Sequence, residues 1–311
     1  ELSGDINVTV TLPANAVAGD TLTITDGTTA QTVVLSSTDI SNGNVLTTFA
    51  SPGDGNTISV SAFVTDVAGN TGATASDTAI VDTSISATIS LDTITADSII
   101  NAAESTGSIS VTGTVGGDVA DGDIVQLTIN GKTFVGVASS GTFSINVAAS
   151  DLLADTDHVV DASVSITDVA GNTVTANDSE GYSVDTVAPS APTVTITEDT
   201  NNDGFVNSSE LSGNIDVVVA LPVGVVAGDT LTITDGVTTQ TFVLSPADIT
   251  NGSVATTFPS PGDGNAINVT AFVTDIAGNP GTTGSDSALI DATPPAASIT
   301  LSTSITADDV I

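Results

Sequence analysis

The segment NIDVVVALPVGVVAGDTLTITDG, residues 214–236, contains two short stretches in which apolar residues recur at every second position. This period is typical of β-strands with one buried face, and the flanking Gly, Pro, Asn and Asp residues are typical of turns. The same pattern predicts seven strands and no helix here: Thr193–Thr197, Ile215–Leu221, Thr230–Thr234, Thr239–Leu244, Val254–Phe258, Ile267–Thr274 and Ser285–Ile290. Seven short strands in about 100 residues indicate an all-β, immunoglobulin-like sandwich.

This segment belongs to a long internal repeat. ELSGNIDVVVALP, from Glu210, matches ELSGDINVTVTLP, from Glu1, and the motifs VAGDTLTITDG and FVTD(V/I)AGN recur at the same spacing of 209 residues. A more distant copy, ITDVAGN at 166–172, lies between them. Periodic self-similarity of this kind is the signature of repeat architectures. We therefore expect tandem sandwiches of about seven strands, end to end in a rod.

The repeat sets the expected domain boundaries. Residues 1–82 form a unit of type A that lacks its first strand, 83–185 a unit of type B, and 186–291 a second unit of type A. Residues 292–311 match the start of the B unit and are expected to be the first strand of a fourth. The sequence has neither an initiator Met nor a signal peptide, so we expect it to be a segment of a longer protein.

The charge balance restricts the partners. The chain has 37 acidic residues, one Lys and no Arg, with a formal net charge of −36. Nucleic acids and anionic lipids are bound through Lys and Arg, so neither is expected as a partner, and no apolar run is long enough for membrane insertion. With no Cys there are no disulfides. Another cation must supply the counter-charge, or the folded chain carries strong self-repulsion.

A calcium site is predicted in DTNNDGFVNSSE, residues 199–210, which fits the twelve-residue loop pattern D-x-[DN]-x-[DN]-G-x5-E at every specified position. Side-chain oxygens would come from Asp199, Asn201, Asp203 and Asn207, the Phe205 carbonyl would point inward, and Glu210 would close the shell. The alternative is a solvated Asp/Asn turn. The B unit carries a weaker version with Asp97, Asn101 and Glu104 in register, but Thr93 and Thr95 stand at the first two ligand positions.

A second set of acids is expected at the junctions, because the B–C and F–G loops of a sandwich lie at the end where the chain enters. The predicted ligands are Asp82, Asp123 and Asp168 at the first junction and Asp185, Asp229 and Asp275 at the second. Two carboxylates 4 Å apart repel by roughly 4 kcal/mol at an effective dielectric near 20, and a divalent cation would reverse that effect. Solvated loop acids are the alternative. Asn70, Asn172 and Asn279, which close the three DxAGN loops, are interpreted as turn formers.

These motifs resemble a known family. The D(V/I)AGN loop, NGKTF from Asn130 and ADxxINAAE in the B unit look like the immunoglobulin-like extender repeats of large calcium-dependent, type I-secreted (RTX-type) bacterial adhesins of biofilms. The resemblance covers essentially the whole chain, although the A units differ through the SPGDGN insertions at Ser51 and Ser260. It implies an extracellular, cell-surface stalk that holds a terminal binding domain away from the cell and is stiffened by several Ca²⁺ ions.

Other functions remain open at this stage. Rows of Thr, such as Thr230, Thr232 and Thr234, could serve a module that binds glycan, ice or a host surface, although a solvated strand face explains them too. An enzyme is not expected: His158, beside Asp157, is the sole His, and no phosphate loop or catalytic triad is present. A third possibility is a head-to-tail fibre in which Ala297–Thr303 fills the vacant first-strand position of another copy.

Overall fold

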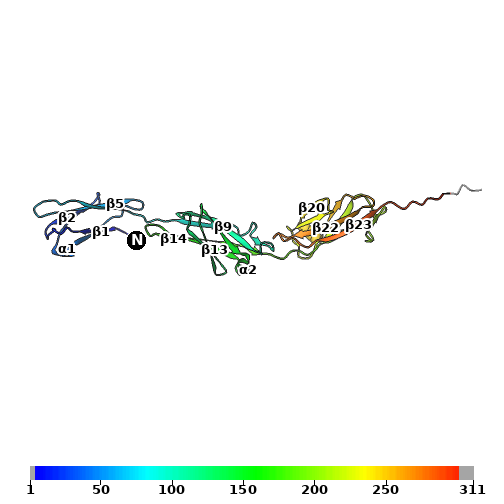
Figure 1. Ribbon diagram of the computed structural model, residues 1–311, viewed down its shortest axis with the longest axis horizontal. Coiled ribbons are helices and arrows are strands. Elements are labelled where there is room, and N and C mark those ends of the chain that lie inside the picture. The colour runs from blue at the N-terminus through cyan, green and yellow to red at the C-terminus, as the bar shows by residue number, and fades with distance from the viewer. Residues whose placement is uncertain (1–3, 301–311) are drawn as a thin grey trace, which may run out of the picture.

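The three sandwiches lie end to end along one long axis (Figure 1) in the computed structural model, which describes residues 4–300. We refer to residues 4–82, 83–185 and 186–291 as the first, second and third units. Each contains two mainly antiparallel sheets that use only strands of that unit, and the short strands β8 and β17 pair in parallel. The all-β, immunoglobulin-like fold expected from the alternation is confirmed.

The first unit has a two-stranded and a four-stranded sheet, in the orders β1-β4 and β3-β2-β5-β6. Its elements are β1 (Ile6–Thr11), β2 (Thr21–Thr25), β3 (Ala30–Val34), α1 (Ser37–Asn42), β4 (Asn44–Phe49), β5 (Thr57–Thr65) and β6 (Ala75–Ile80). Within the described residues, no strand lies on the side of β1 opposite β4. This part of the first unit is therefore open.

The second unit has the sheets β12-β9-β7 and β11-β10-β13-β14, and the short parallel pair β15-β8. Its elements are β7 (Ala87–Leu91), β8 (Ile99–Ile100), β9 (Ser108–Gly117), β10 (Ile124–Ile129), β11 (Lys132–Val137), β12 (Thr142–Ala148), α2 (Ala149–Leu153), β13 (Val159–Thr167), β14 (Thr173–Gly181) and β15 (Ser183–Val184). β7 is the first strand of this unit, and it pairs with β9. The described residues of the first unit contain no equivalent strand beside β1.

The third unit repeats the first and adds that strand, with sheets β16-β18-β21 and β17-β23-β22-β19-β20. Its elements are β16 (Thr193–Ile196), β17 (Phe205–Asn207), β18 (Ile215–Ala220), β19 (Thr230–Thr234), β20 (Thr239–Val243), α3 (Pro246–Asn251), β21 (Ser253–Phe258), β22 (Ala266–Thr274) and β23 (Gly284–Asp291). All seven predicted strands are present to within a residue or two at their ends.

The cores are built from the inward positions of facing strands. In β18, Ile215, Val217 and Val219 are fully buried, while Asp216 points to solvent. Three separate clusters of buried residues result, one in each unit. Hydrophobic burial of this kind supplies the main stabilisation of each sandwich.

The prediction of no helix is wrong at three places. Helices α1, α2 and α3 have five or six residues each, and each lies between two consecutive strands. In α1, the Ser36 hydroxyl accepts from the Asp39 amide, and the Asp39 carboxylate accepts from the Ser36 amide, which forms a capping box. Gly43 then ends the helix in the left-handed region at φ 70°. No helix among residues 4–300 is long and apolar enough to cross a membrane.

Candidate functional site

The loop predicted to bind calcium in the third unit curls around its first residue. Asp199 is 6% exposed, and its carboxylate accepts from the Asp203 and Gly204 amides at 3.0 and 2.8 Å. Gly204 has a φ of 85°, the left-handed conformation that a sharp turn requires. Asn201 bonds to Asp203 through both its amide nitrogen and its carbonyl oxygen. The first half of the loop is thus held by hydrogen bonds to carboxylate and amide oxygens.

The second half of the loop is closed by Glu210. Its Oε2 accepts from the Asn207 backbone and side chain at 3.0 and 2.6 Å, and its Oε1 accepts from the Thr200 hydroxyl at 2.8 Å. Glu210 therefore joins the two ends of the loop through hydrogen bonds. Phe205 lies between the halves on β17 and is 48% exposed.

The loop of the second unit shares the second half of this arrangement and part of the first half. Glu104 Oε2 accepts from the Asn101 amide at 3.1 Å, as Glu210 does from Asn207. Asp97 accepts from the Thr95 hydroxyl and the Ile99 amide, at 3.1 and 3.0 Å. The equivalent Asp203 likewise accepts from Asn201 and from the Phe205 amide, both at 2.9 Å. The Thr residues at the first two ligand positions therefore leave this loop with fewer oxygen donors than its counterpart.

Both loops lie at the end of the unit where the chain leaves. β8 pairs in parallel with β15, and β17 pairs in parallel with β23, so each A–B loop lies next to the strand that leads into the linker. The Ala102 amide of the second unit donates to Asn279 Oδ1 of the third at 2.7 Å. The A–B loops and the junction acids were predicted as two separate sets. At the second junction, the A–B loop of the second unit contacts the Asn279 side chain that also binds Asp275.

The second junction is organised around Asn279, which is 1% exposed. Its side-chain nitrogen donates to the Asp185 carbonyl of the linker and to the Asp275 carboxylate, both at 2.9 Å. Asp229 is also buried, and it accepts from the Ile276 amide at 3.1 Å, which joins the B–C loop to the F–G loop. Linker and loops of two units thus form one hydrogen-bonded network.

The first junction follows the same plan with fewer contacts. Asn172 donates to the Asp82 carbonyl at 3.1 Å and to Asp168 at 2.8 Å. The Asn172 side-chain amide holds the pKa of the Asp168 carboxyl below its ordinary value, an effect that exceeds the opposing desolvation. Asp123 accepts from the Ala120 amide within its own turn.

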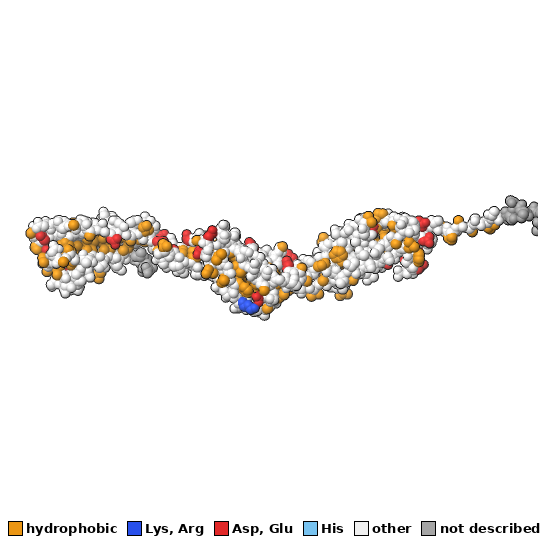
Figure 2. Space-filling view, viewed as in Figure 1, with side chains coloured by type: hydrophobic (Ala, Val, Ile, Leu, Met, Phe, Trp, Pro, Cys, Tyr) orange, Lys and Arg blue, Asp and Glu red, His pale blue; other side chains and the backbone are white. Residues whose placement is uncertain are grey.

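At the second junction Asp185, Asp229 and Asp275 belong to one hydrogen-bonded network. At the first, Asn172 joins Asp82 and Asp168, whereas among residues 4–300 no hydrogen bond links Asp123 to either of them. The carboxylates do not converge at either junction. Among residues 4–300, no group of three or more His, Asp or Glu side chains is placed to hold a metal ion. Asp168 and Asp275 are hydrogen-bonded within their own loops, and Asp82 and Asp185 meet the next unit through backbone carbonyls. Figure 2 shows acidic atoms at both junctions and at the far end of the third unit.

Two kinds of linker contact were missed from the sequence. Asn172 and Asn279 are turn formers, as interpreted, but they also clamp the linker. Asp54 accepts from the Thr83 amide at 2.6 Å and from the Ser84 hydroxyl at 2.8 Å, and Asp263 bonds in the same way to residues 292 and 293. The SPGDGN insertions that contain these two acids were the available signal, because they distinguish the A units.

The features considered for ligand binding have structural explanations. Tyr182, the only Tyr in the sequence, is 8% exposed, and its hydroxyl donates to the Leu152 carbonyl at 2.7 Å. Its ring contacts the His158 ring in a tilted arrangement, with the ring centroids 5.4 Å apart. It therefore offers no surface for stacking on a sugar. Thr230, Thr232 and Thr234 form a half-buried outer row on β19 beside other Thr side chains of the sheet.

Comparisons with known proteins agree with this architecture. Neither the family models nor the curated proteins that were compared include a match. Among solved structures, one from a 1.5-MDa bacterial ice-binding adhesin is 29% identical, covering 93% of this chain and 92% of that chain with a TM-score of 0.54. A Ca²⁺-stabilized adhesin with which an Antarctic bacterium binds ice is 34% identical, covering 94% of this chain and 71% of that chain, with a TM-score of 0.49.

The chain belongs to the immunoglobulin-like extender repeats of large bacterial adhesins. A single bacterial immunoglobulin-like domain from the M. primoryensis ice-binding adhesin is 44% identical and covers 33% of this chain and 99% of that domain, with a TM-score of 0.30. The family resemblance drawn from the DxAGN and ADxxINAAE motifs is confirmed.

Proposed function

We propose that this adhesin segment is a stalk: a rod on the bacterial cell surface whose units are held in line by Ca²⁺ at the linkers and the A–B loops. The observation that carries the proposal is the second junction, where Asn279 bonds to the linker and to the A–B loop of the preceding unit. A junction built from both partners can transmit stiffness. A flexible linker between separate domains lacks such contacts.

The repetition of the units also favours a spacer. The first and third units share the order of their common strands, their capped helices and their linker-binding acids. Length is the property that such duplication increases. Structural neighbours among adhesin repeats support a role without enzymatic activity.

Calcium is proposed because the residues fit its chemistry. Ca²⁺ takes six to eight oxygen ligands, and residues 199–210 gather carboxylate and amide oxygens in one loop closed by Glu210. The ligands proposed are Asp199, Asn201, Asp203, the Phe205 carbonyl, Asn207 and Glu210, with Asp97, Asn101 and Glu104 forming a lesser site. At the junctions, Asp82, Asp123, Asp168, Asp185, Asp229 and Asp275 are the proposed ligands. The relative described as Ca²⁺-stabilized supports the same ion here.

The charge supports the need for such an ion. The chain has one Lys and 37 acidic residues, and this Lys132 pairs with Asp151 within the second unit. Few other positive groups are therefore present to offset the acids at the junctions. A bound divalent cation would lower the repulsion there and would hold the linker.

Calorimetric titration of the 311-residue chain with Ca²⁺, and with Mg²⁺ as the comparison ion, tests the proposal. We expect binding in the millimolar range or tighter, as for other extracellular calcium modules. Asp203→Ala should abolish one binding event. Asp216→Ala removes an equal charge from the outer face of β18 and should leave the titration unchanged. Equal Ca²⁺ binding by the two variants would contradict the assigned site.

A further inference from the structure

The chain contains nine glycines that follow Asn or Asp, the dipeptides in which a backbone nitrogen can attack the preceding side chain. Three are Asn–Gly, at 42–43, 130–131 and 251–252, and six are Asp–Gly, at 26–27, 54–55, 121–122, 203–204, 235–236 and 263–264. Glycine has no Cβ to hinder the approach of its nitrogen. An Asn side chain reacts more readily than Asp, because a charged carboxylate is a poor electrophile. The three Asn–Gly pairs are therefore the places to examine for spontaneous deamidation.

The structure holds eight of these nine glycine amides in hydrogen bonds. The amides of Gly43 and Gly252 end helices α1 and α3, and each donates to two helix carbonyls, at 2.9 and 3.3 Å and at 2.8 and 3.2 Å. In all six Asp–Gly pairs the glycine amide donates to a carbonyl, hydroxyl or carboxylate oxygen at 2.8–3.1 Å. A hydrogen-bonded amide is shielded from solvent base until the structure opens locally. These eight nitrogens are thus kept from reacting.

Gly131 is the exception. Asn130 and Gly131 form the two-residue turn of the β10–β11 hairpin, in which Ile129 pairs with Lys132. Both turn residues have positive φ, 50° and 70°, as in the type I′ turns that Asn–Gly favours. Both are exposed, and among residues 4–300 neither the Gly131 amide nor the Asn130 side chain has a hydrogen bond. The nucleophile, the electrophile and water therefore meet at this one turn.

We propose that Asn130 deamidates spontaneously in the folded chain and that the isoaspartate product loosens β11. The Gly131 nitrogen attacks Asn130 Cγ, and the new N–Cγ bond closes a five-membered succinimide. The Cγ–Nδ2 bond breaks, and the leaving group takes up the Gly131 amide proton and departs as ammonia. One water then opens the ring: cleavage of the N–Cγ bond gives aspartate, and cleavage at the main-chain carbonyl gives isoaspartate. No oxidant or reductant is needed, and because calcium takes no part, failure of this proposal leaves the stalk proposal intact.

The two products affect the hairpin differently. An aspartate before glycine suits the same two-residue turn. An isoaspartate carries its Cβ in the main chain, which lengthens a turn whose length sets the pairing of β10 with β11. β11 is the edge strand of its sheet, and a Cβ at Gly136 would lie 2.6 Å from the buried Ile145, so this strand packs closely on the core. Loss of the β10–β11 pairing would uncover that part of the core.

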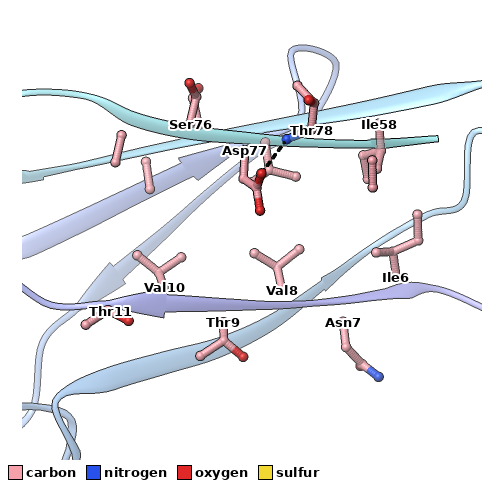
Figure 3. A pocket seen from close by; sticks show the side chains of 15 residues that line it. Ile6, Asn7, Val8, Thr9, Val10, Thr11, Ile58, Ser76, Asp77 and Thr78 are labelled. Carbon is pink, nitrogen blue, oxygen red and sulfur yellow. Dashed lines mark hydrogen bonds between the residues drawn. The ribbon is translucent and has the colours of Figure 1, made fainter.

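The first unit shows what an uncovered part of a sandwich presents to solvent. A groove of about 380 Å³ lies between β1 and β6, and Ile6, Val8 and Val10 point into it from β1 (Figure 3). All three are only half-buried. The isoaspartate form should expose a similar apolar surface beside Ile145. Ageing of the rod should therefore begin in the second unit, at the β10–β11 hairpin.

Mass spectrometry of peptides from the 311-residue chain, aged at pH 8 and 37 °C, tests the chemistry with internal controls. In the folded chain, Asn42 and Asn251 should deamidate about 5- to 150-fold more slowly than Asn130, the factor for breaking the two hydrogen bonds of each capped amide. In denaturant the three sites should react at similar rates, since no amide is then held. Folded-state rates at Asn42 or Asn251 equal to that at Asn130 would overturn the proposal, as would an Asn130 that reacts only in denaturant.

Hydrogen exchange of the aged chain tests the effect on β11. The deamidated fraction can be separated by ion exchange, because each product adds one negative charge. Its isoaspartate form should lose amide protection in β11, whereas the edge strand β20 of the third unit should keep it. Asn130→Gly keeps a turn suited to positive φ and cannot react, so after equal ageing it should retain the protection of fresh protein. Unchanged protection of β11 in the isoaspartate form would refute the loosening.

Discussion

Replacing Asn279 with Ala tests whether the junction is a built structure. The substitution removes the hydrogen bonds to the Asp185 carbonyl and the Ala102 amide, at 2.9 and 2.7 Å, and both cross from the third unit to the linker or the second unit. Each such bond contributes about 0.5–1.5 kcal/mol net, so the closed junction should lose about 1–3 kcal/mol relative to open arrangements. That is about a 5- to 150-fold fall in the ratio of closed to open molecules.

Distances between spin labels measure this ratio directly. The chain has no Cys, so Val135→Cys and Val243→Cys, at exposed positions of the second and third units, give one labelled pair across the junction. The wild-type distance distribution in Ca²⁺ should be narrow, and Asn279→Ala should broaden it.

Asn70→Ala is the matched control, because Asn70 makes the same bond to its own loop, Asp66, at 2.8 Å, but lies in the first unit, away from the labelled junction. It should leave the distribution narrow. Equal widths for wild type and Asn279→Ala, with calcium present, would refute the role given to this side chain.

Two further predictions concern acid and packing. The pKa of the Asp168 carboxyl lies below its ordinary 3.8 because Asn172 bonds to the charged form, so its stabilisation is complete above the unfolded-state pKa and is lost as the pH falls through the folded-state value. Scanning calorimetry from pH 6 to pH 2.5 should show a smaller acid-induced fall in the melting temperature for Asp168→Ala than for Asp216→Ala, and equal falls would contradict this. Gly284→Ala should destabilise the third unit, because its new Cβ would meet the Pro192 carbonyl at 1.9 Å. Ala75→Gly, at the equivalent position of the open first unit, should change the melting temperature little; equal effects would show that strand packing is not the cause.

The sequence was sufficient for the fold and the repeat because both depend on local patterns. Alternation over residues such as Ile215–Leu221 reports burial of one strand face, and the turn residues report where strands end. The short strands β8 and β17 were not predicted. They contain only two and three residues and lie inside loops, so they are too short to show an alternating pattern. The helices α1 and α3 are single turns, fixed by a capping box and a C-terminal Gly.

The junctions could be predicted in part. The topology of a sandwich placed Asp168, Asp229 and Asp275 at the end where the chain enters, and the structure agrees. The importance of Asn279 could not be derived from its motif, because a turn-forming Asn and a linker-binding Asn have the same local sequence. Its second role depends on a carbonyl 94 residues away, at Asp185, which only the packing of two units brings within reach.

The central claim is that calcium holds the units in line, and small-angle scattering of the 311-residue chain tests it most directly. In millimolar Ca²⁺ the curve should fit an extended rod with the end-to-end order of the three units, and excess chelator should lower the radius of gyration as the junctions loosen. Returning Ca²⁺ should restore the first curve, whereas Mg²⁺ at equal concentration should restore less. An identical radius of gyration with calcium and with chelator would contradict the account.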